Sequence, residues 1–141
     1  MLPFSHIKHI CFNVEDIEAA EAIFTRVFGV TSTGITTMPL DGGKGVVKTA
    51  FFHLERGSIE LAYHELPDSW KDSPINTGPG FHHIAFEVAN FDGALSSLAE
   101  KGIFPLDQFP MRTPHGRVAF FNPKQTGGIL IELGEKEDHS I

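Results

Sequence analysis

The sequence predicts an α+β fold in which one βαβββ module occurs twice in tandem. Residues 7–14 (IKHICFNV) and 81–88 (FHHIAFEV) share His, Ile, Phe and Val at one fixed offset. Each segment has the apolar–polar alternation of a half-buried strand, and a helical pattern follows each. Later in each half, Ala-Phe-Phe and Ile-Glu-Leu recur in the same order. A repeat of this kind indicates two similar modules rather than one continuous motif.

The first module is predicted to span residues 5–66. After its first strand, Asp16 is the expected N-cap of a helix that Gly29 terminates. The apolar stripe expected on this helix consists of Ile17, Ala20, Phe24, Val27 and Phe28. About three strands follow, and the glycines around Lys44 predict a hairpin or a mobile loop because they lack the spacing of a phosphate-binding loop.

The second module is predicted to span residues 81–135, after a proline-rich linker over residues 67–80. Its helix is expected to begin after Asn90 and to stop at Gly102. The apolar stripe of this helix consists of Phe91, Ala94, Leu95 and Leu98. Three extra residues, compared with the first module, fall in the loop over residues 122–128. We interpret residues 1–141 as a single domain made of these two modules.

Composition excludes several classes of function. The 141 residues are 41% hydrophobic, which is enough to bury a core, and the formal charge of −7 opposes binding to nucleic acid or to an anionic membrane. The single cysteine, Cys11, allows no internal disulfide, and no apolar run reaches the length of a membrane span. The sequence therefore predicts a soluble cytoplasmic protein.

Four polar residues repeat in type and in place, since His9 corresponds to His83 and Glu60 to Glu132. Each glutamate points away from its bulky strand neighbours, either to a solvated sheet face or to the inside of a curved sheet. A carboxylate inside the fold needs a partner, and one cation satisfies two carboxylates at once. We therefore predict a metal site. The other histidines have no repeat partner and are expected to be surface or packing residues: His6, His53, His64, His82, His115 and His139.

The paired modules resemble the vicinal oxygen chelate superfamily, which includes glyoxalase I, methylmalonyl-CoA epimerases, extradiol dioxygenases and bleomycin-resistance proteins. Within it, the chain looks most like the methylmalonyl-CoA epimerases, through residues 72–75 (DSPI), 80–88 (GFHHIAFEV), 115–124 (HGRVAFFNPK) and 127–133 (GGILIEL). The chain differs from typical epimerases of this superfamily at two places. The linker after Ile75 is shorter than in typical epimerases, and Lys48 stands where some epimerases have a glutamate.

The resemblance implies a curved, mostly antiparallel sheet around one divalent metal ion, which is Zn, Co, Ni, Mn or Fe, bound by His9, Glu60, His83 and Glu132. It implies an enzyme that abstracts a proton α to the carbonyl of an acyl-CoA thioester such as methylmalonyl-CoA, and a homodimer. We expect Glu132 to act as the base, with a pKa raised by a dry, phenylalanine-rich pocket. Lys48 is the second candidate acid or base.

Three other functions stay open on the sequence alone. A glyoxalase I-like lactoylglutathione lyase uses the same types of ligand. An extradiol dioxygenase needs two histidines and one carboxylate, so Glu60 counts against it as a fourth ligand. A non-catalytic small-molecule-binding protein does not need the four ligands at all.

Overall fold

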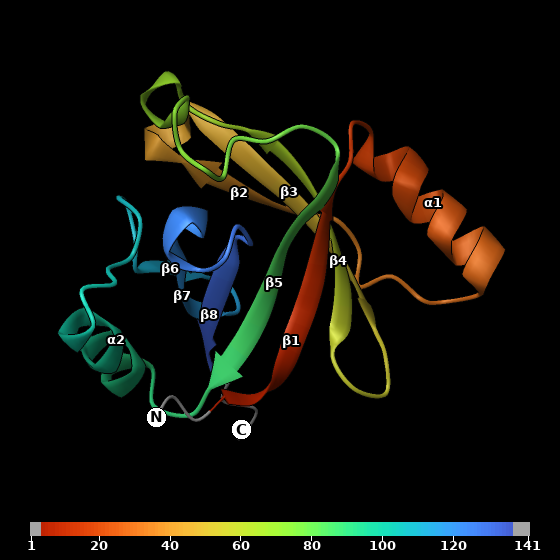
Figure 1. Cartoon of the computed structure of the whole chain (residues 1–141). Coiled ribbons are helices and arrows are strands. Elements are labelled where there is room, and N and C mark those ends of the chain that lie inside the picture. Colours follow the sequence, from red (N-terminus) through yellow and green to blue (C-terminus); the bar gives the residue numbers. More distant parts are fainter. Residues whose placement is uncertain (1–3, 137–141) are drawn as a thin grey trace. The chain divides into compact units, whose positions relative to one another are not determined.

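The computed structural model describes residues 4–136, and both predicted modules are present in it (Figure 1). The first module contains β1 (Phe4–Asn13), α1 (Ile17–Phe28), β2 (Thr36–Leu40), β3 (Gly45–His53) and β4 (Ser58–Glu65). The second contains β5 (Gly80–Val88), α2 (Phe91–Glu100), β6 (Met111–Thr113), β7 (Gly116–Phe121) and β8 (Ile131–Glu135). Short 3₁₀ turns cover Asp41–Gly43, Asp68–Trp70 and Pro123–Gln125. The βαβββ order and the α+β class are confirmed.

The chain divides into two compact units, which are described separately. The N-terminal unit comprises residues 9–82, and the C-terminal unit comprises residues 4–8 together with residues 83–136. Residues 4–8 belong to the C-terminal unit because, for example, the ring of Phe4 stacks on that of Phe86 with centroids 4.5 Å apart. No helix in the described residues is both long and apolar enough to cross a membrane.

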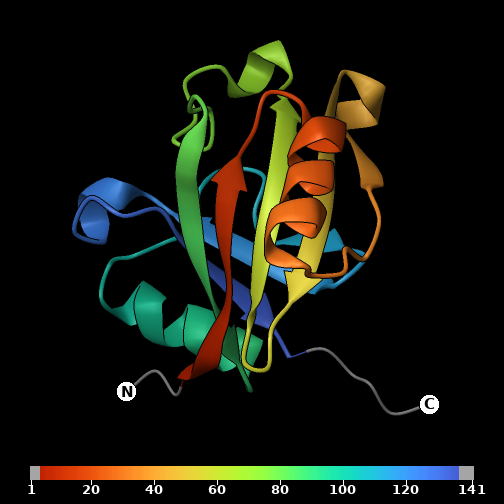
Figure 2. The ribbon, with the colours of Figure 1, turned by 90° about the vertical axis from the view of Figure 1, so that its right-hand side faces the viewer.

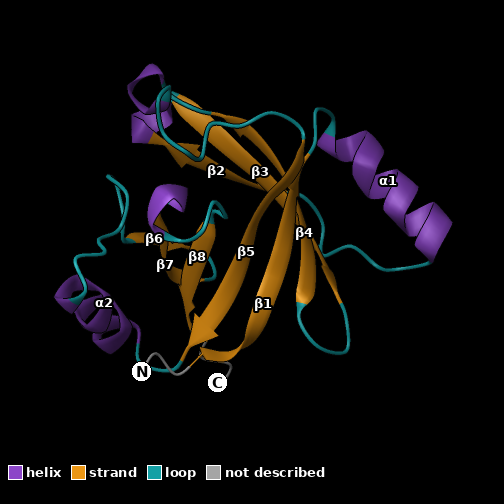
Figure 3. Ribbon diagram, in the orientation of Figure 1, coloured by secondary structure: helices purple, strands orange, loops and turns teal. Residues whose placement is uncertain are grey.

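The two units have the same strand pairing, and Figure 3 shows their strands in orange. In the N-terminal unit the order is β2-β3-β4-β1, and in the C-terminal unit it is β6-β7-β8-β5. β4 pairs antiparallel with β3 and parallel with β1, and β8 pairs antiparallel with β7 and parallel with β5. Four of the six pairings within the units are antiparallel, as predicted.

The helix α1 covers one face of the N-terminal sheet (Figure 2). The Asp16 carboxylate accepts a hydrogen bond from the Ala19 N–H, and Gly29 ends the helix with a left-handed φ of 66°. Ile17 packs against Ala50, Phe52 and Leu61 in the core beneath it. The predicted apolar stripe is wrong at the C-terminal end of α1, because Val27 and Phe28 are 56% and 65% exposed. These residues belong to the last helical turn, and burial is confined to the turns before it.

The helix α2 covers one face of the C-terminal sheet in the same way. The Asn90 side chain accepts a hydrogen bond from the Gly93 N–H, and Gly102 follows the helix with φ of 76°. The predicted apolar stripe is confirmed, since Phe91 and Ala94 are buried and Leu95 and Leu98 pack against the same core. That core also contains the buried side chains of Val88, Ala119, Phe121 and Leu133.

The predicted hairpin between β2 and β3 is confirmed, and its last glycine is sterically required. A Cβ on Gly45 would lie 2.5 Å from the Glu65 carbonyl oxygen and 2.6 Å from Pro67 Cδ. Real side chains do not approach backbone this closely, so Gly45 lets β3 start directly against the end of β4. In the β3–β4 register that follows, Phe51 lies opposite Glu60.

Candidate metal-binding site

In the N-terminal unit, β1 and β4 place a histidine and a glutamate in contact. Leu61 faces the helix-covered core, so Glu60 projects from the opposite sheet face because side chains alternate along a strand. The Nε2 atom of His9 lies 3.3 Å from Oε1 of Glu60. Both residues are buried, with 5% and 8% of their surfaces exposed. The first half of the predicted ligand set therefore forms one buried pair.

The C-terminal unit repeats this arrangement. Leu133 faces the core under α2, so Glu132 projects from the other face of β8. The Nε2 atom of His83 lies 3.5 Å from Oε2 of Glu132. These residues are 3% and 5% exposed. The sequence repeat is thus also a repeat of side-chain geometry, with one His–Glu pair in each unit.

The spacing within each pair fits two ligands of one metal ion. Zinc–nitrogen and zinc–oxygen bonds of about 2.0–2.2 Å put neighbouring ligand atoms roughly 3.0–3.5 Å apart at octahedral to tetrahedral angles. The observed separations of 3.3 and 3.5 Å between imidazole nitrogen and carboxylate oxygen match that range. Imidazole nitrogen and carboxylate oxygen are also the donors that divalent transition metals take in proteins. Each pair therefore suits a divalent cation by chemistry and by distance.

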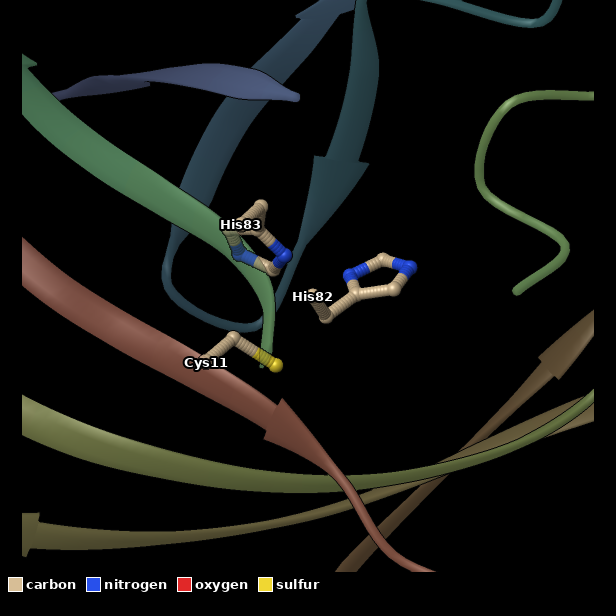
Figure 4. A group of neighbouring side chains, drawn as sticks. All are labelled: Cys11, His82 and His83. Carbon is tan, nitrogen blue, oxygen red and sulfur yellow. The ribbon is translucent and has the colours of Figure 1, made fainter. Parts of the chain in front are cut away.

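The face of the N-terminal sheet that carries His9 and Glu60 continues with further polar groups. Cys11 and Asn13 follow His9 at alternate positions of β1, and both are buried. The Asn13 amide donates to the carbonyl oxygens of Thr77 and Gly78 at 3.3 and 3.5 Å, which ties β1 to the segment after β4. Figure 4 shows Cys11 on β1 together with His82 and the next residue, His83, on β5. Cys11 Sγ and a ring nitrogen of His82 lie within 4.8 Å of each other.

Two histidines of this unit, the partly buried His64 and the buried His82, pack against each other. The rings of His64 and His82 have centroids 4.9 Å apart, and Nε2 of His82 donates to the Ile75 carbonyl oxygen at 2.8 Å. Burial, helped by the neighbouring His82, lowers the pKa of His64 to about 4. Burial also lowers the pKa of His82, against the opposing effect of its hydrogen bond to Ile75. Both imidazoles are therefore neutral at pH 7.

Sequence reasoning treated His64 and His82 as ordinary surface or packing residues. The structure makes them packing residues of an unusual kind, because their rings contact each other and Cys11 Sγ lies within 4.8 Å of a ring nitrogen of His82. The alternation Glu60, Ala62, His64 already places His64 on the same face of β4 as Glu60. That signal was available in the sequence, whereas the approach of His82 depends on the path of residues 66–80.

The structure does not bring Lys48 to the face that carries Glu60. Lys48 lies opposite Tyr63 in the β3–β4 ladder, and Tyr63 packs against the core under α1. Directly opposed residues in an antiparallel pair project from the same face, so Lys48 projects on the helix side. Its ammonium lies 6.0 Å from the centre of the Tyr63 ring.

The remaining histidines within residues 4–136 lie nearer the surface. His6 is half exposed and lies 3.5 Å from a Glu87 oxygen, and exposed His53 contacts the Ser58 hydroxyl at 2.7 Å. His115 is exposed as well. His139 lies outside the described residues.

A model of the glyoxalase/bleomycin resistance protein/dioxygenase superfamily matches residues 8–121. The chain belongs to this superfamily. The match covers most of the chain, from β1 to β7, so the resemblance stated from the sequence is confirmed.

Several curated relatives within the superfamily are similar over most of their length. The human mitochondrial methylmalonyl-CoA epimerase is 33% identical over 134 residues, which are 90% of this chain and 72% of the relative. The ethylmalonyl-CoA/methylmalonyl-CoA epimerase of Cereibacter sphaeroides is 33% identical over 135 residues, covering 90% of this chain and 95% of the relative. The uncharacterized protein YqjC of Bacillus subtilis is 30% identical over 137 residues, which are 93% of this chain and 92% of the relative.

Solved structures agree with the fold. A variant of Streptomyces coelicolor methylmalonyl-CoA epimerase in complex with 2-nitronate-propionyl-CoA matches with a TM-score of 0.71 and 26% identity, over 95% of this chain and 99% of that chain. A methylmalonyl-CoA epimerase in complex with methylmalonyl-CoA and NH4+ matches with a TM-score of 0.74 and 26% identity. The match covers 95% of this chain and 96% of that chain. The predicted superfamily fold is therefore confirmed.

Proposed function

We propose that this protein is a metal-dependent acyl-CoA epimerase that removes and returns a proton at the carbon next to a thioester carbonyl. The observation that carries the proposal is the duplicated His–Glu pair, buried and spaced as metal ligands in both units. The names of the relatives supply the substrate class, since several act on methylmalonyl-CoA or ethylmalonyl-CoA. Methylmalonyl-CoA is therefore the first substrate to test.

In this proposal one divalent ion is shared by His9, Glu60, His83 and Glu132. Each pair offers two ligands, whereas divalent transition metals in proteins take four or more, counting water or substrate. Two neutral imidazoles and two carboxylates also balance the charge of one divalent ion. The same stoichiometry of one ion per chain applies whether the two pairs come from one chain or from two chains of a homodimer. The homodimer and the cytoplasmic location stay predictions.

An ion held by these residues would supply positive charge where the thioester oxygen becomes negative, which lowers the barrier to proton removal. The chain's own residues have to handle the proton. Glu132 is the proposed base, because its carboxylate is buried and its cross-strand neighbour is Phe120. A carboxylate among apolar groups is a better proton acceptor than a solvated one. Lys48 is not part of the proposal, since its side chain projects on the helix side of β3.

The proposal is tested by loading the protein with Co²⁺, Mn²⁺ or Zn²⁺ and incubating it with methylmalonyl-CoA in D₂O. We expect the α-hydrogen of the thioester to exchange for deuterium, with no exchange in chelator-treated protein. No exchange with methylmalonyl-CoA, ethylmalonyl-CoA or any other thioester in a metal-loaded sample would contradict it. The hemithioacetal of methylglyoxal and glutathione, and a catechol with Fe²⁺ and O₂, serve as parallel substrates. Turnover of either one alone would assign the lyase or the dioxygenase instead.

A further inference from the structure

Phe51 and Phe120 occupy equivalent places in the two units, one beside each His–Glu pair. Phe51 lies directly opposite Glu60 in the β3–β4 ladder, and Phe120 lies directly opposite Glu132 in the β7–β8 ladder. Opposed residues in antiparallel strands project from the same sheet face. Each phenylalanine therefore shares a face with the carboxylate of its own pair.

Both rings also contact the histidine of the pair, in nearly perpendicular geometry. The Phe51 and His9 ring centroids are 5.5 Å apart at an interplanar angle of 72°. The Phe120 and His83 centroids are 4.9 Å apart at 90°. Perpendicular aromatic contacts at this range are favourable beyond the area they bury. The same contact has thus been kept in both copies of the module.

The contact restricts the one torsion that decides where the histidine nitrogen points. Rotation about the Cβ–Cγ bond of histidine is broad in the absence of neighbours. The lone pair of Nε2 lies in the ring plane, so this rotation aims it toward the carboxylate or away from it. We propose that Phe51 and Phe120 are positioning residues, which hold the imidazoles of His9 and His83 in the orientation that binds the metal. This inference rests on the metal site of the proposed function.

The two phenylalanines are not held equally firmly. Phe120 is 8% exposed and is braced on another side by Phe109, with ring centroids 5.1 Å apart at 68°. Phe51 is only partly buried, and one of its aromatic neighbours is the exposed His53, with ring centroids 6.4 Å apart. We therefore expect removal of the Phe120 ring to weaken metal binding more than removal of the Phe51 ring. Residues that orient metal ligands typically change metal affinity by about 10–100-fold when replaced.

The chain supplies matched control residues. Phe52 and Phe121 follow Phe51 and Phe120 directly, and they project from the opposite sheet faces into the cores under α1 and α2. They are 0% and 1% exposed. Replacing either one by leucine disturbs packing without touching a histidine of the pairs. A change in metal affinity that is specific to Phe51 and Phe120 therefore cannot be ascribed to loss of a buried phenylalanine in general.

The experiment measures Co²⁺ affinity by competition with a chromophoric chelator, and the visible absorption spectrum of the Co²⁺ form, for four variants. Phe120→Leu is expected to weaken Co²⁺ binding by roughly 10-fold or more and to alter the spectrum, and Phe51→Leu to do so by less. Phe52→Leu and Phe121→Leu are expected to lower the unfolding midpoint in urea while leaving affinity and spectrum unchanged. If Phe120→Leu does not fold, Phe120→Met takes its place, because it keeps most of the side-chain volume.

The outcomes separate this inference from the proposed function. Wild-type Co²⁺ affinity and spectrum in both Phe51→Leu and Phe120→Leu overturn the positioning role while leaving the metal site intact. Equal losses of affinity in all four variants overturn it too, since they indicate a packing effect. A wild-type protein that binds Co²⁺ but exchanges no thioester proton contradicts the proposed epimerase alone. A wild-type protein that binds no metal contradicts both.

Discussion

The two units share a His–Glu pair flanked by a phenylalanine, but they differ in what surrounds that pair. In the N-terminal unit the same face continues with the buried Cys11 and Asn13 and the partly buried His64, whose ring contacts that of the buried His82. In the C-terminal unit Phe120 lies between His83 and Phe109, so the surroundings are aromatic. The candidate ligand positions thus recur in both copies, while the rings beside His83 are aromatic and the residues that follow His9 and Glu60 on their strands include polar side chains. This difference favours Glu132 over Glu60 as the carboxylate that accepts a proton.

The largest expected effect is a difference between the two glutamates. Glu132→Gln and Glu60→Gln remove the same charge from equivalent positions, so both are expected to weaken metal binding. Only Glu132→Gln is expected to lower the exchange rate by a further ~10²–10⁴-fold at equal metal content, since general-base catalysis contributes about that much. The measurement is deuterium uptake by methylmalonyl-CoA, normalised to bound metal. Equal losses in the two variants would mean that Glu132 is a ligand and not the base.

The cores under the two helices are expected to contribute similarly to stability. Phe52→Ala and Phe121→Ala each remove a fully buried ring and should each lower the free energy of unfolding by about 3–5 kcal/mol. Phe28→Ala serves as the control, because its 65% exposed side chain predicts a much smaller loss. Urea unfolding followed by circular dichroism measures all three. A loss near zero for either Phe52→Ala or Phe121→Ala would show that the two cores are not equivalent.

His64 of the N-terminal unit predicts a pH effect. His64 has a folded pKa of about 4, below its usual value near 6.5, so protonation favours the unfolded chain. The folded state is therefore expected to lose stability as the pH falls from about 6.5 toward 4, by up to about 3 kcal/mol from this residue. The difference in unfolding free energy between wild type and His64→Gln should shift in favour of the variant over that range.

Exposed His53 provides the control for His64. His53→Gln removes an exposed histidine of the same unit and is measured over the same pH range. If His64→Gln and His53→Gln gave the same pH dependence as wild type, the buried, neutral state of His64 would be wrong.

The smallest effect is expected at the surface of the C-terminal unit. Arg117 donates to Asp92 at 3.0 Å and to Glu135 at 3.1 Å, and its hydrogen bonds and charge hold the pKa of both carboxyl groups below the usual range. The stabilisation is present above the ordinary carboxyl pKa and is lost as the pH falls through the lowered folded values. Arg117→Gln is thus expected to lower the melting temperature slightly at pH 7 and by less as the pH falls below the ordinary carboxyl range. If Arg117→Gln had the melting temperature of the wild type at pH 7, the ion pairs of Arg117 would contribute nothing to stability.

The sequence alone was sufficient wherever the information was local or repeated. The caps Asp16 and Asn90 follow from side-chain chemistry at helix starts, and the four candidate ligands follow from comparing the two halves. Features that depend on which strands meet were not predictable from local pattern. The resemblance to the epimerases points to Lys48, whereas its register opposite Tyr63 decides the sheet face from which it projects. The burial of His82 depends on Ile75, seven residues earlier in the linker.

The most direct test of the central claim is the number of divalent ions bound per chain when one pair is removed. Equilibrium dialysis with Zn²⁺ or Co²⁺ followed by elemental analysis applies to the wild type, to His9→Ala and to His83→Ala. If the two His–Glu pairs share one ion, the wild type binds one ion per chain, and either substitution abolishes tight binding even though the other pair is intact. Two ions per wild-type chain, or one ion retained after a substitution in either unit, would show instead that the pairs act separately and would contradict the account.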